Sequence, residues 1–154
     1  MPLAALVALA VVVSSSFAAE AISPEETLKR YLTAIQSQDF NKAFDLVSKG
    51  MKTDRRSGQV RSREVWVKES QYLVQLSEVK IFDFQIFPGK IEGDVAKVPN
   101  ILSSQDKFLN QLGVEEHELY TLVKEGGAWK VDQQEMVIDA AGLARWFPKS
   151  GSKP

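Results

Sequence analysis

The fold class predicted by this sequence is α+β, with helices in the first half of the chain and an antiparallel sheet in the second. In residues 23–50 and 62–76 the apolar side chains recur at the spacing of one helical face. From residue 79 onward the apolar spacing changes to the alternation of a β-strand. Gly126-Gly127 separates two apolar runs and predicts a hairpin turn, because glycine readily takes positive φ angles.

The composition is that of an ordinary globular domain. The 154 residues fit one domain, and 44% hydrophobic with 25% charged residues can build a core. A net charge of −1 gives no basic field, so we expect no nucleic-acid partner. With no cysteine and one histidine, disulfides, thiolate metal sites and multi-histidine metal sites are excluded. We therefore expect neither a metal nor a cofactor.

The first 21 residues are expected to be a signal peptide. Leu3–Val13 is an unbroken apolar run that is shorter than the ~20 residues of a transmembrane helix. The small residues after it allow cleavage after Ala18 or after Ala21, and an uncleaved N-terminal anchor is the alternative. The prediction is a periplasmic or secreted domain over residues 22–148, followed by a disordered tail over residues 149–154.

Each expected helix begins at a side chain that can accept a hydrogen bond from the first turn. The capping residues of the four expected helices are Ser23, Asp39, Ser62 and Asp139. In the first helix Pro24 suits the first position and Glu26 would complete a capping box. The second helix is expected to run to Gly50. The apolar stripes of these two helices comprise Leu28, Tyr31, Leu32 and Ile35, then Phe40, Ala43, Phe44 and Val47.

The first expected strand follows residue 79. Phe82, Phe84 and Ile86 are predicted to share the core face, which leaves Asp83 on the opposite face. The second strand is expected over Val95–Leu102.

Three further features shape the expected sheet. Pro99 indicates an edge position or a bulge, since proline cannot donate to a β-ladder. Residues 103–113 are expected to form an irregular connection. Residues 118–133 then form the last hairpin and complete four strands.

A basic loop is expected over residues 51–61. Lys52, Arg55, Arg56 and Arg61 could form an anion-binding rim. Asp54 interrupts the positive charge, which favours an ordinary solvated loop.

Three stretches resemble one known family. The opening "YLTAIQSQDFNKAF", the turn into a strand "IEGDVAKV" and the hairpin "LYTLVKEGGAWKVDQ" are similar to the nuclear transport factor 2-like superfamily, in an exported bacterial member. The resemblance covers about residues 23–134. It implies three N-terminal helices packed on a curved four-stranded antiparallel sheet, a short C-terminal helix, and a cone-shaped interior.

The resemblance also implies candidate site residues. The candidates for lining an apolar pocket in the cone are Tyr31, Ile35, Phe44, Trp66, Tyr72, Phe84, Tyr120 and Trp129. The superfamily includes isomerases, dehydratases and polyketide cyclases as well as non-catalytic binders, so the fold does not settle the function. The nearest candidates for catalytic groups are Tyr31, Asp83 and His117.

The favoured function is an exported, non-enzymatic domain that binds a small apolar ligand or a protein partner, in the cone or on the open sheet face. The alternative is an isomerase-, dehydratase- or cyclase-like enzyme that uses Tyr31, Asp83 or His117. A third hypothesis is a homodimer that pairs through the sheet. It requires outward-facing apolar residues, for which the candidates are Ile81, Phe87, Tyr120 and Leu122.

Overall fold

The computed structural model describes residues 22–107 and 111–148. The expected signal peptide (1–21) and the expected tail (149–154) lie outside the described residues. In the described part the helices are α1 (Pro24–Gln36), α2 (Phe40–Phe44), α3 (Lys49–Lys52), α4 (Arg63–Ser77) and α5 (Ala140–Trp146). The strands are β1 (Lys80–Ile86), β2 (Lys90–Glu92), β3 (Val95–Asp106), β4 (Gln111–Glu125) and β5 (Ala128–Met136).

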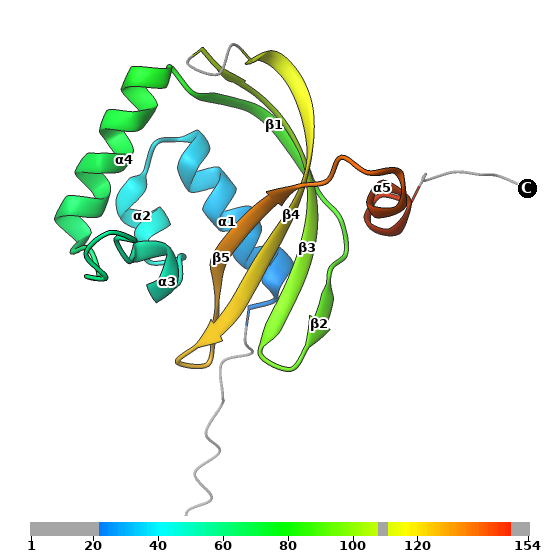
Figure 1. The fold of residues 1–154 in the computed structure, drawn as a ribbon, viewed down its shortest axis with the longest axis horizontal. Coiled ribbons are helices and arrows are strands. Elements are labelled where there is room, and N and C mark those ends of the chain that lie inside the picture. Colours follow the sequence, from blue (N-terminus) through cyan, green and yellow to red (C-terminus); the bar gives the residue numbers. More distant parts are fainter. Residues whose placement is uncertain (1–21, 108–110, 149–154) are drawn as a thin grey trace, which may run out of the picture.

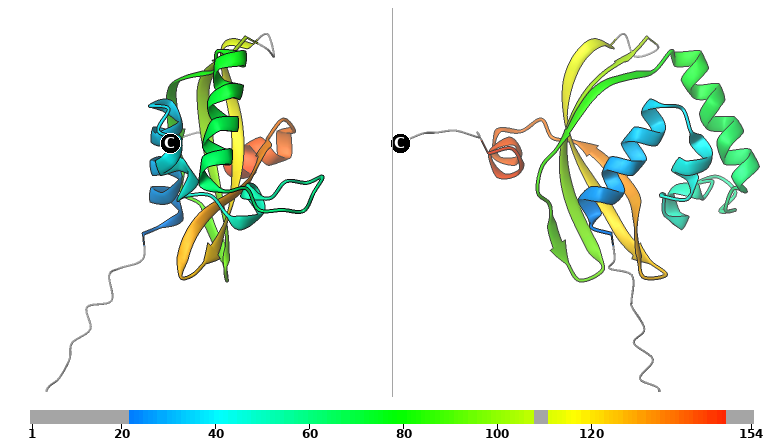
Figure 2. Two further views of the ribbon diagram at one scale, coloured as in Figure 1. Left: turned by 90° about the vertical axis from the view of Figure 1, so that its left-hand side faces the viewer. Right: turned by 180° about the vertical axis from the view of Figure 1, so that it is seen from behind.

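The sheet is antiparallel throughout, in the order β1-β3-β4-β5, and β2 pairs with β3 on the same edge as β1. It curves around α1, and the other N-terminal helices lie on that same side (Figure 1). The opposite face carries α5, as both views in Figure 2 show. The α+β class is therefore confirmed. The helix and strand numbers differ from the expected three N-terminal helices and four strands.

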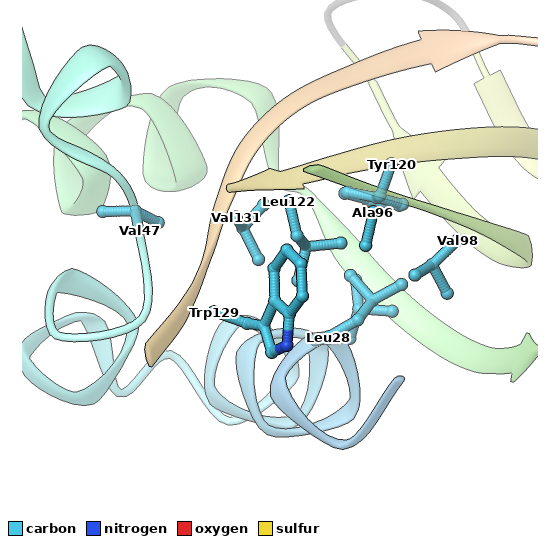
Figure 3. Packing of buried hydrophobic residues seen from close by; sticks show 9 residues of the cluster. Leu28, Val47, Ala96, Val98, Tyr120, Leu122, Trp129 and Val131 are labelled. Atoms are coloured by element: carbon cyan, nitrogen blue, oxygen red, sulfur yellow. The ribbon is translucent and has the colours of Figure 1, made fainter. Parts of the chain in front are cut away.

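The core fills the space between α1 and the sheet. Leu28 of α1 and Trp129 of β5 lie between the helix and the strands (Figure 3). The rest of the cluster comes largely from β3, β4 and β5, and its fully buried members include Val98, Leu122 and Val131. Burial of this apolar surface is the main term that holds helix and sheet together.

The predicted caps begin the helices where the sequence places them. Ser23 Oγ accepts a hydrogen bond from the backbone N–H of Glu26 at 3.1 Å, and Ser62 and Asp139 cap α4 and α5 in the same way. The reciprocal half of the capping box is not formed. The Glu26 carboxylate instead pairs with Arg30, one turn further on, at 3.2 Å.

The expected second helix is divided. α2 ends at Phe44, and α3 begins after Ser48, whose hydroxyl accepts from the backbone N–H of Met51 at 3.0 Å. Between them, Val47 is fully buried and pairs with Val131 of β5. The helical spacing of Val47 is therefore misleading, because its side chain belongs to the core beside the sheet.

The described part of residues 103–113 is not an irregular connection. β3 and β4 continue through most of this region as a paired ladder with one register shift at Ser104/Gln105. Pro99 lies in an interior strand, and its position is neither at a sheet edge nor in a bulge. The Pro99 carbonyl accepts from Phe87 N–H at 2.9 Å, opposite the gap between β1 and β2. The missing proline N–H faces that same gap, so it removes no ladder bond.

The first strand departs from strict alternation. The β1–β3 register shifts between Ile81 and Asp83, so Phe82 sits in a bulge and is 51% exposed. Phe84 and Ile86 pack against the core as expected.

The hairpin between β4 and β5 also forms as expected, with φ of 59° at Gly126 and 80° at Gly127.

The four residues proposed for dimer pairing do not share an exposed face of the sheet, and Ile81 lines a cavity beside α1. Tyr120 and Leu122 are buried core residues on the α1 side of the sheet. Phe87 is on the α5 side and packs edge-to-face against Phe147 of the C-terminal segment, with ring centroids 5.4 Å apart.

Within residues 22–107 and 111–148, none of the helices is long and apolar enough to cross a membrane.

Candidate functional site

A cavity of about 430 Å³ lies between α1 and the upper half of the sheet. Its wall is largely apolar, and the apolar lining comprises Leu32, Ile35, Val79, Ile81, Leu102 and Met136. Its polar lining comprises Tyr31, Ser104, Asp106, Glu116, Glu118, Tyr120 and Gln134. A volume of this size, with an apolar wall and a few grouped polar atoms, is typical of sites for small organic molecules.

Glu118 is the most deeply buried charged side chain of this cavity, at 2% exposure. It lies on β4 opposite Asn100 of β3 and Met136 of β5. Its carboxylate accepts hydrogen bonds from Asn100 Nδ2 at 3.0 Å and from the Tyr120 hydroxyl at 3.3 Å. The amide of Gln134 on β5 donates a third bond. Three adjacent strands therefore converge on one carboxyl group.

Burial changes the acid strength of Glu118. Removal of the carboxyl group from water raises its pKa from 4.5 to about 7, and the nearby charge of Glu116 acts in the same direction. The hydrogen bonds from Asn100, Tyr120 and Gln134 stabilise the ionised form and oppose this rise. Because all three donors are neutral, they only partly offset the loss of hydration. Glu118 can therefore gain or lose a proton near neutral pH.

The two tyrosines of the cavity keep their protons. Burial, followed by the negative charge of Glu118, raises the pKa of Tyr31 to about 12. The same two causes raise the pKa of Tyr120 well above 10.0. Both phenols are therefore neutral hydrogen-bond donors at physiological pH.

Asn100 lies next to Glu118 but is not one of the residues that line the cavity. The side chain is fully buried, and its Nδ2 is used by Glu118. Among the described residues, no hydrogen-bond donor reaches its Oδ1. A buried acceptor without a donor costs free energy, on the order of 1–3 kcal/mol.

Comparison with known proteins gives likeness in structure alone. No protein-family model and no curated protein sequence matches the chain. A putative ketosteroid isomerase from Shewanella frigidimarina superposes with a TM-score of 0.50 at 18% identity, covering 75% of this chain and 95% of that one. RPA3114, a SEC-C motif containing protein from Rhodopseudomonas palustris, gives 0.50 at 16% identity, with 75% and 80% covered.

The sheet curves around α1, and the structure matches that of a putative ketosteroid isomerase. Both observations agree with the resemblance found in the sequence. The chain has the nuclear transport factor 2-like fold. Bd1075 of Bdellovibrio bacteriovorus matches 73% of this chain, with a TM-score of 0.49 and 13% identity. The match spans only 39% of the length of Bd1075.

The nuclear transport factor 2-like fold places three of the eight candidate pocket residues around the cavity, namely Tyr31, Ile35 and Tyr120. The other five are elsewhere. Phe44 and Trp66 pack edge-to-face between α2 and α4, with ring centroids 5.7 Å apart. Phe84 and Trp129 belong to the core, and Tyr72 on α4 is 64% exposed.

The three candidate catalytic residues do not converge in this fold. Tyr31 lines the cavity, but Asp83 is exposed and accepts from the backbone N–H of Phe84 at 2.9 Å. His117 is on the α5 side of the sheet, with its ring 4.7 Å from that of Phe147. The titratable group that the fold brings beside Tyr31 is Glu118, which the sequence reasoning missed. Its signal was the alternation on β4, in which Glu118 is in phase with Tyr120 and Leu122.

The basic loop borders a second, larger depression of about 880 Å³. Charges of both signs line it, including Arg55, Arg56, Asp54 and Asp132. Arg55 and Arg56 are exposed, and Arg61 is paired with Asp54 at 3.2 Å. The Nε of Arg61 is buried and is also paired with Glu69 at 2.6 Å, so this charge is already used within the protein and the cavity at Glu118 is the better candidate. Within the described residues no group of three or more histidine, aspartate or glutamate side chains could hold a metal ion.

Proposed function

We propose that this protein is an exported binding domain that holds a small amphipathic molecule in the cavity between α1 and the sheet. The observation that carries the proposal is an apolar cavity of about 430 Å³ that ends on the buried carboxyl group of Glu118. Apolar side chains favour a ligand with a hydrocarbon body, and the polar lining residues, with Glu118 the most buried, fix its orientation. This geometry supports a small ligand over a protein partner.

The first test is binding of a neutral apolar fluorophore, N-phenyl-1-naphthylamine. We expect its emission to rise on addition of the protein. Ile35→Trp fills the cavity from α1 and should abolish the rise. Leu102→Trp fills it from β3 and serves as a second variant should the first not fold.

The matched control is Ile91→Trp. Ile91 lies on β2 and is 56% exposed, at the other end of β3 from the cavity. This variant should bind the fluorophore like the wild type. Equal emission from the wild type and both cavity-filling variants would place the fluorophore elsewhere and refute the proposal.

A second candidate function is proton transfer on a carbonyl compound. The observation that favours it is the pKa of Glu118, raised by burial to about 7, beside the neutral phenol of Tyr31. The ionised carboxyl group would take a proton from the carbon next to a ketone, and Tyr31 would donate a hydrogen bond to the enolate oxygen. The proton on Glu118 would then return to carbon.

Deuterium exchange tests this second candidate. A cyclic β,γ-unsaturated ketone is incubated with protein in D₂O, and NMR follows deuterium uptake at the carbon beside the carbonyl. If the candidate is correct, exchange rises with pH through about 7 because the base is the ionised Glu118. Exchange that is absent, or unchanged in Glu118→Gln, leaves the binding function.

Export is a separate part of the proposal and rests on the apolar run of residues 3–13. The full-length chain is expressed in a Gram-negative host, and the periplasmic fraction is analysed by intact mass. We expect a mature protein that begins at residue 19 or residue 22. Full-length protein in the cytoplasm or the membrane would contradict this part of the proposal.

A further inference from the structure

The charged side chains that line the cavity all have one sign. They are Asp106, Glu116 and Glu118, and none of the described lining residues is lysine, arginine or histidine. An anionic ligand would meet carboxyl groups on β3 and β4, and no cationic side chain among these lining residues would bind it. The potential inside the cavity therefore favours positive charge.

Glu118 has hydrogen bonds but no counter-ion. Its three donors are the amides of Asn100 and Gln134 and the phenol of Tyr120, none of which carries charge. None of the ion pairs among the described residues includes Glu118. Buried carboxylates are ordinarily paired with a cation, because neutral donors replace lost hydration incompletely.

The neighbouring amide adds an independent observation. Asn100 Oδ1 is buried and receives no hydrogen bond from the described residues, while the Nδ2 of the same amide is 3.0 Å from Glu118 Oε1. An unsatisfied acceptor thus lies next to an unpaired carboxylate. A group with positive charge and N–H donors would supply the counter-ion that Glu118 lacks, and an ammonium group has this chemistry.

We infer that the ligand of this cavity is a small organic monocation, a protonated amine with an apolar body. Its ammonium group donates to Glu118, and its hydrocarbon part packs on the wall formed by Ile35 and Leu102. The rings of Tyr31 and Tyr120 line the same space and favour a cation through their π-faces. This inference rests on the proposed binding function and names its ligand class.

The pH dependence of binding distinguishes this ligand from a neutral one. Burial raises the pKa of Glu118 to about 7, so the group is mostly ionised at pH 8 and mostly protonated at pH 6. A cation binds the ionised form and gains affinity as pH rises. A neutral carbonyl compound accepts a hydrogen bond from the protonated form and loses affinity as pH rises.

The other titratable groups that face Glu118 do not reverse this pH dependence of cation binding. Tyr31 on α1 and Tyr120 on β4 remain neutral throughout this range, because burial raises both pKa values. Asp106 on β3 and Glu116 on β4 are carboxyl groups, so neither brings a positive charge to the cavity. The β5 residues of the lining, Gln134 and Met136, do not titrate.

The experiment uses three probes of similar shape: 2-phenylethylamine (a cation), 2-phenylethanol (neutral) and 3-phenylpropionate (an anion). Each displaces N-phenyl-1-naphthylamine from the full-length purified protein at pH 6 and pH 8. At pH 8 the amine should bind at least about tenfold more tightly than the alcohol, and the anion should bind weakest. At pH 6 the preference for the amine should fall. Calorimetry at pH 7 should show release of about half a proton per amine bound.

Glu118→Gln should remove the preference for the amine and retain the affinity for the alcohol. Glu115→Gln is the matched control, since Glu115 is exposed and precedes the cavity residues on the same strand. Should Glu118→Gln not fold, the wild-type pH series decides. Equal or tighter binding of the alcohol at pH 8, or an amine preference that does not rise with pH, overturns the inference while the binding function stands. If neither the fluorophore nor any probe binds, the proposed function fails and the inference with it.

Discussion

At the scale of single residues, Glu118 is the group on which the proposed function and the pH dependence of stability both depend. It is 2% exposed, and neutral donors from β3, β4 and β5 surround its carboxyl group. The fold therefore keeps a group that is costly to ionise at neutral pH. A carboxyl group retained at a stability cost in a cavity is characteristic of a binding or catalytic site.

Replacement of Glu118 by glutamine should stabilise the protein at high pH. The folded-state pKa of about 7 is above the unfolded value of 4.5, so this group contributes stability below pH 4.5 that is lost as pH rises through about 7. The loss amounts to about 3 kcal/mol at most. In urea unfolding at pH 8, Glu118→Gln should exceed the wild type in free energy of unfolding by roughly 1–3 kcal/mol.

The comparison is repeated at pH 5, where the advantage of the variant should shrink because the wild-type carboxyl group is then protonated in the folded state. The exposed residue Glu115 gives the control, and Glu115→Gln should change stability little at either pH. A Glu118→Gln variant that is less stable than the wild type at pH 8 would show that the ionised carboxylate is well compensated.

At the scale of elements, the sequence predicted the helices and turns that depend on residues close together in the chain. The predictions were wrong where pairing with a distant strand determines the structure. α1 and α4 begin at Ser23 and Ser62, because a capping side chain acts on the backbone three residues later. The predicted extent of the second helix was wrong because Val47 follows the helical spacing but pairs with Val131, 84 positions further along the chain. Residues 103–106 and 111–113 carry no strong strand pattern, and they extend the ladder because the neighbouring parts of β3 and β4 are already paired.

The contact of α1 with the sheet should dominate the stability of the fold. Leu28 is fully buried among Trp129 and the β3–β4 side chains. Leu28→Ala should lower the free energy of unfolding by about 2–5 kcal/mol, through lost apolar burial and the cavity left behind. Chemical denaturation measures this. Leu73→Ala on α4 is the control, since Leu73 is 59% exposed, and a loss as large as that for Leu28 would place the core elsewhere.

At the scale of the whole molecule, the helices are unequally anchored. α1 buries five residues in the hollow of the sheet, whereas α4 buries only Val67 and Ser77. Figure 2 shows α4 at the outer side of the helical layer. Its exposed side chains include Val65, Tyr72, Leu73 and Leu76. The molecule thus joins a tightly packed cone to a loosely attached helix.

Native-state hydrogen exchange should report this difference. Amides in the middle of α4 should exchange roughly tenfold or more faster than those of α1, because local opening of α4 exposes less buried surface. The measurement is made by mass spectrometry on the full-length protein under native conditions. Equal protection of the two helices would mean that α4 is held by contacts that burial does not reveal.

The sequence by itself determined the α+β class, the capped starts of α1, α4 and α5, and the Gly126-Gly127 turn, because each depends on residues a few positions apart. It also determined the apolar stripe of α1, which includes Tyr31 and Ile35 of the cavity. Only the tertiary structure decided that Glu118 is a buried acid. Its donors Asn100 and Gln134 are 18 and 16 residues away, and strand register alone brings them to one carboxyl group.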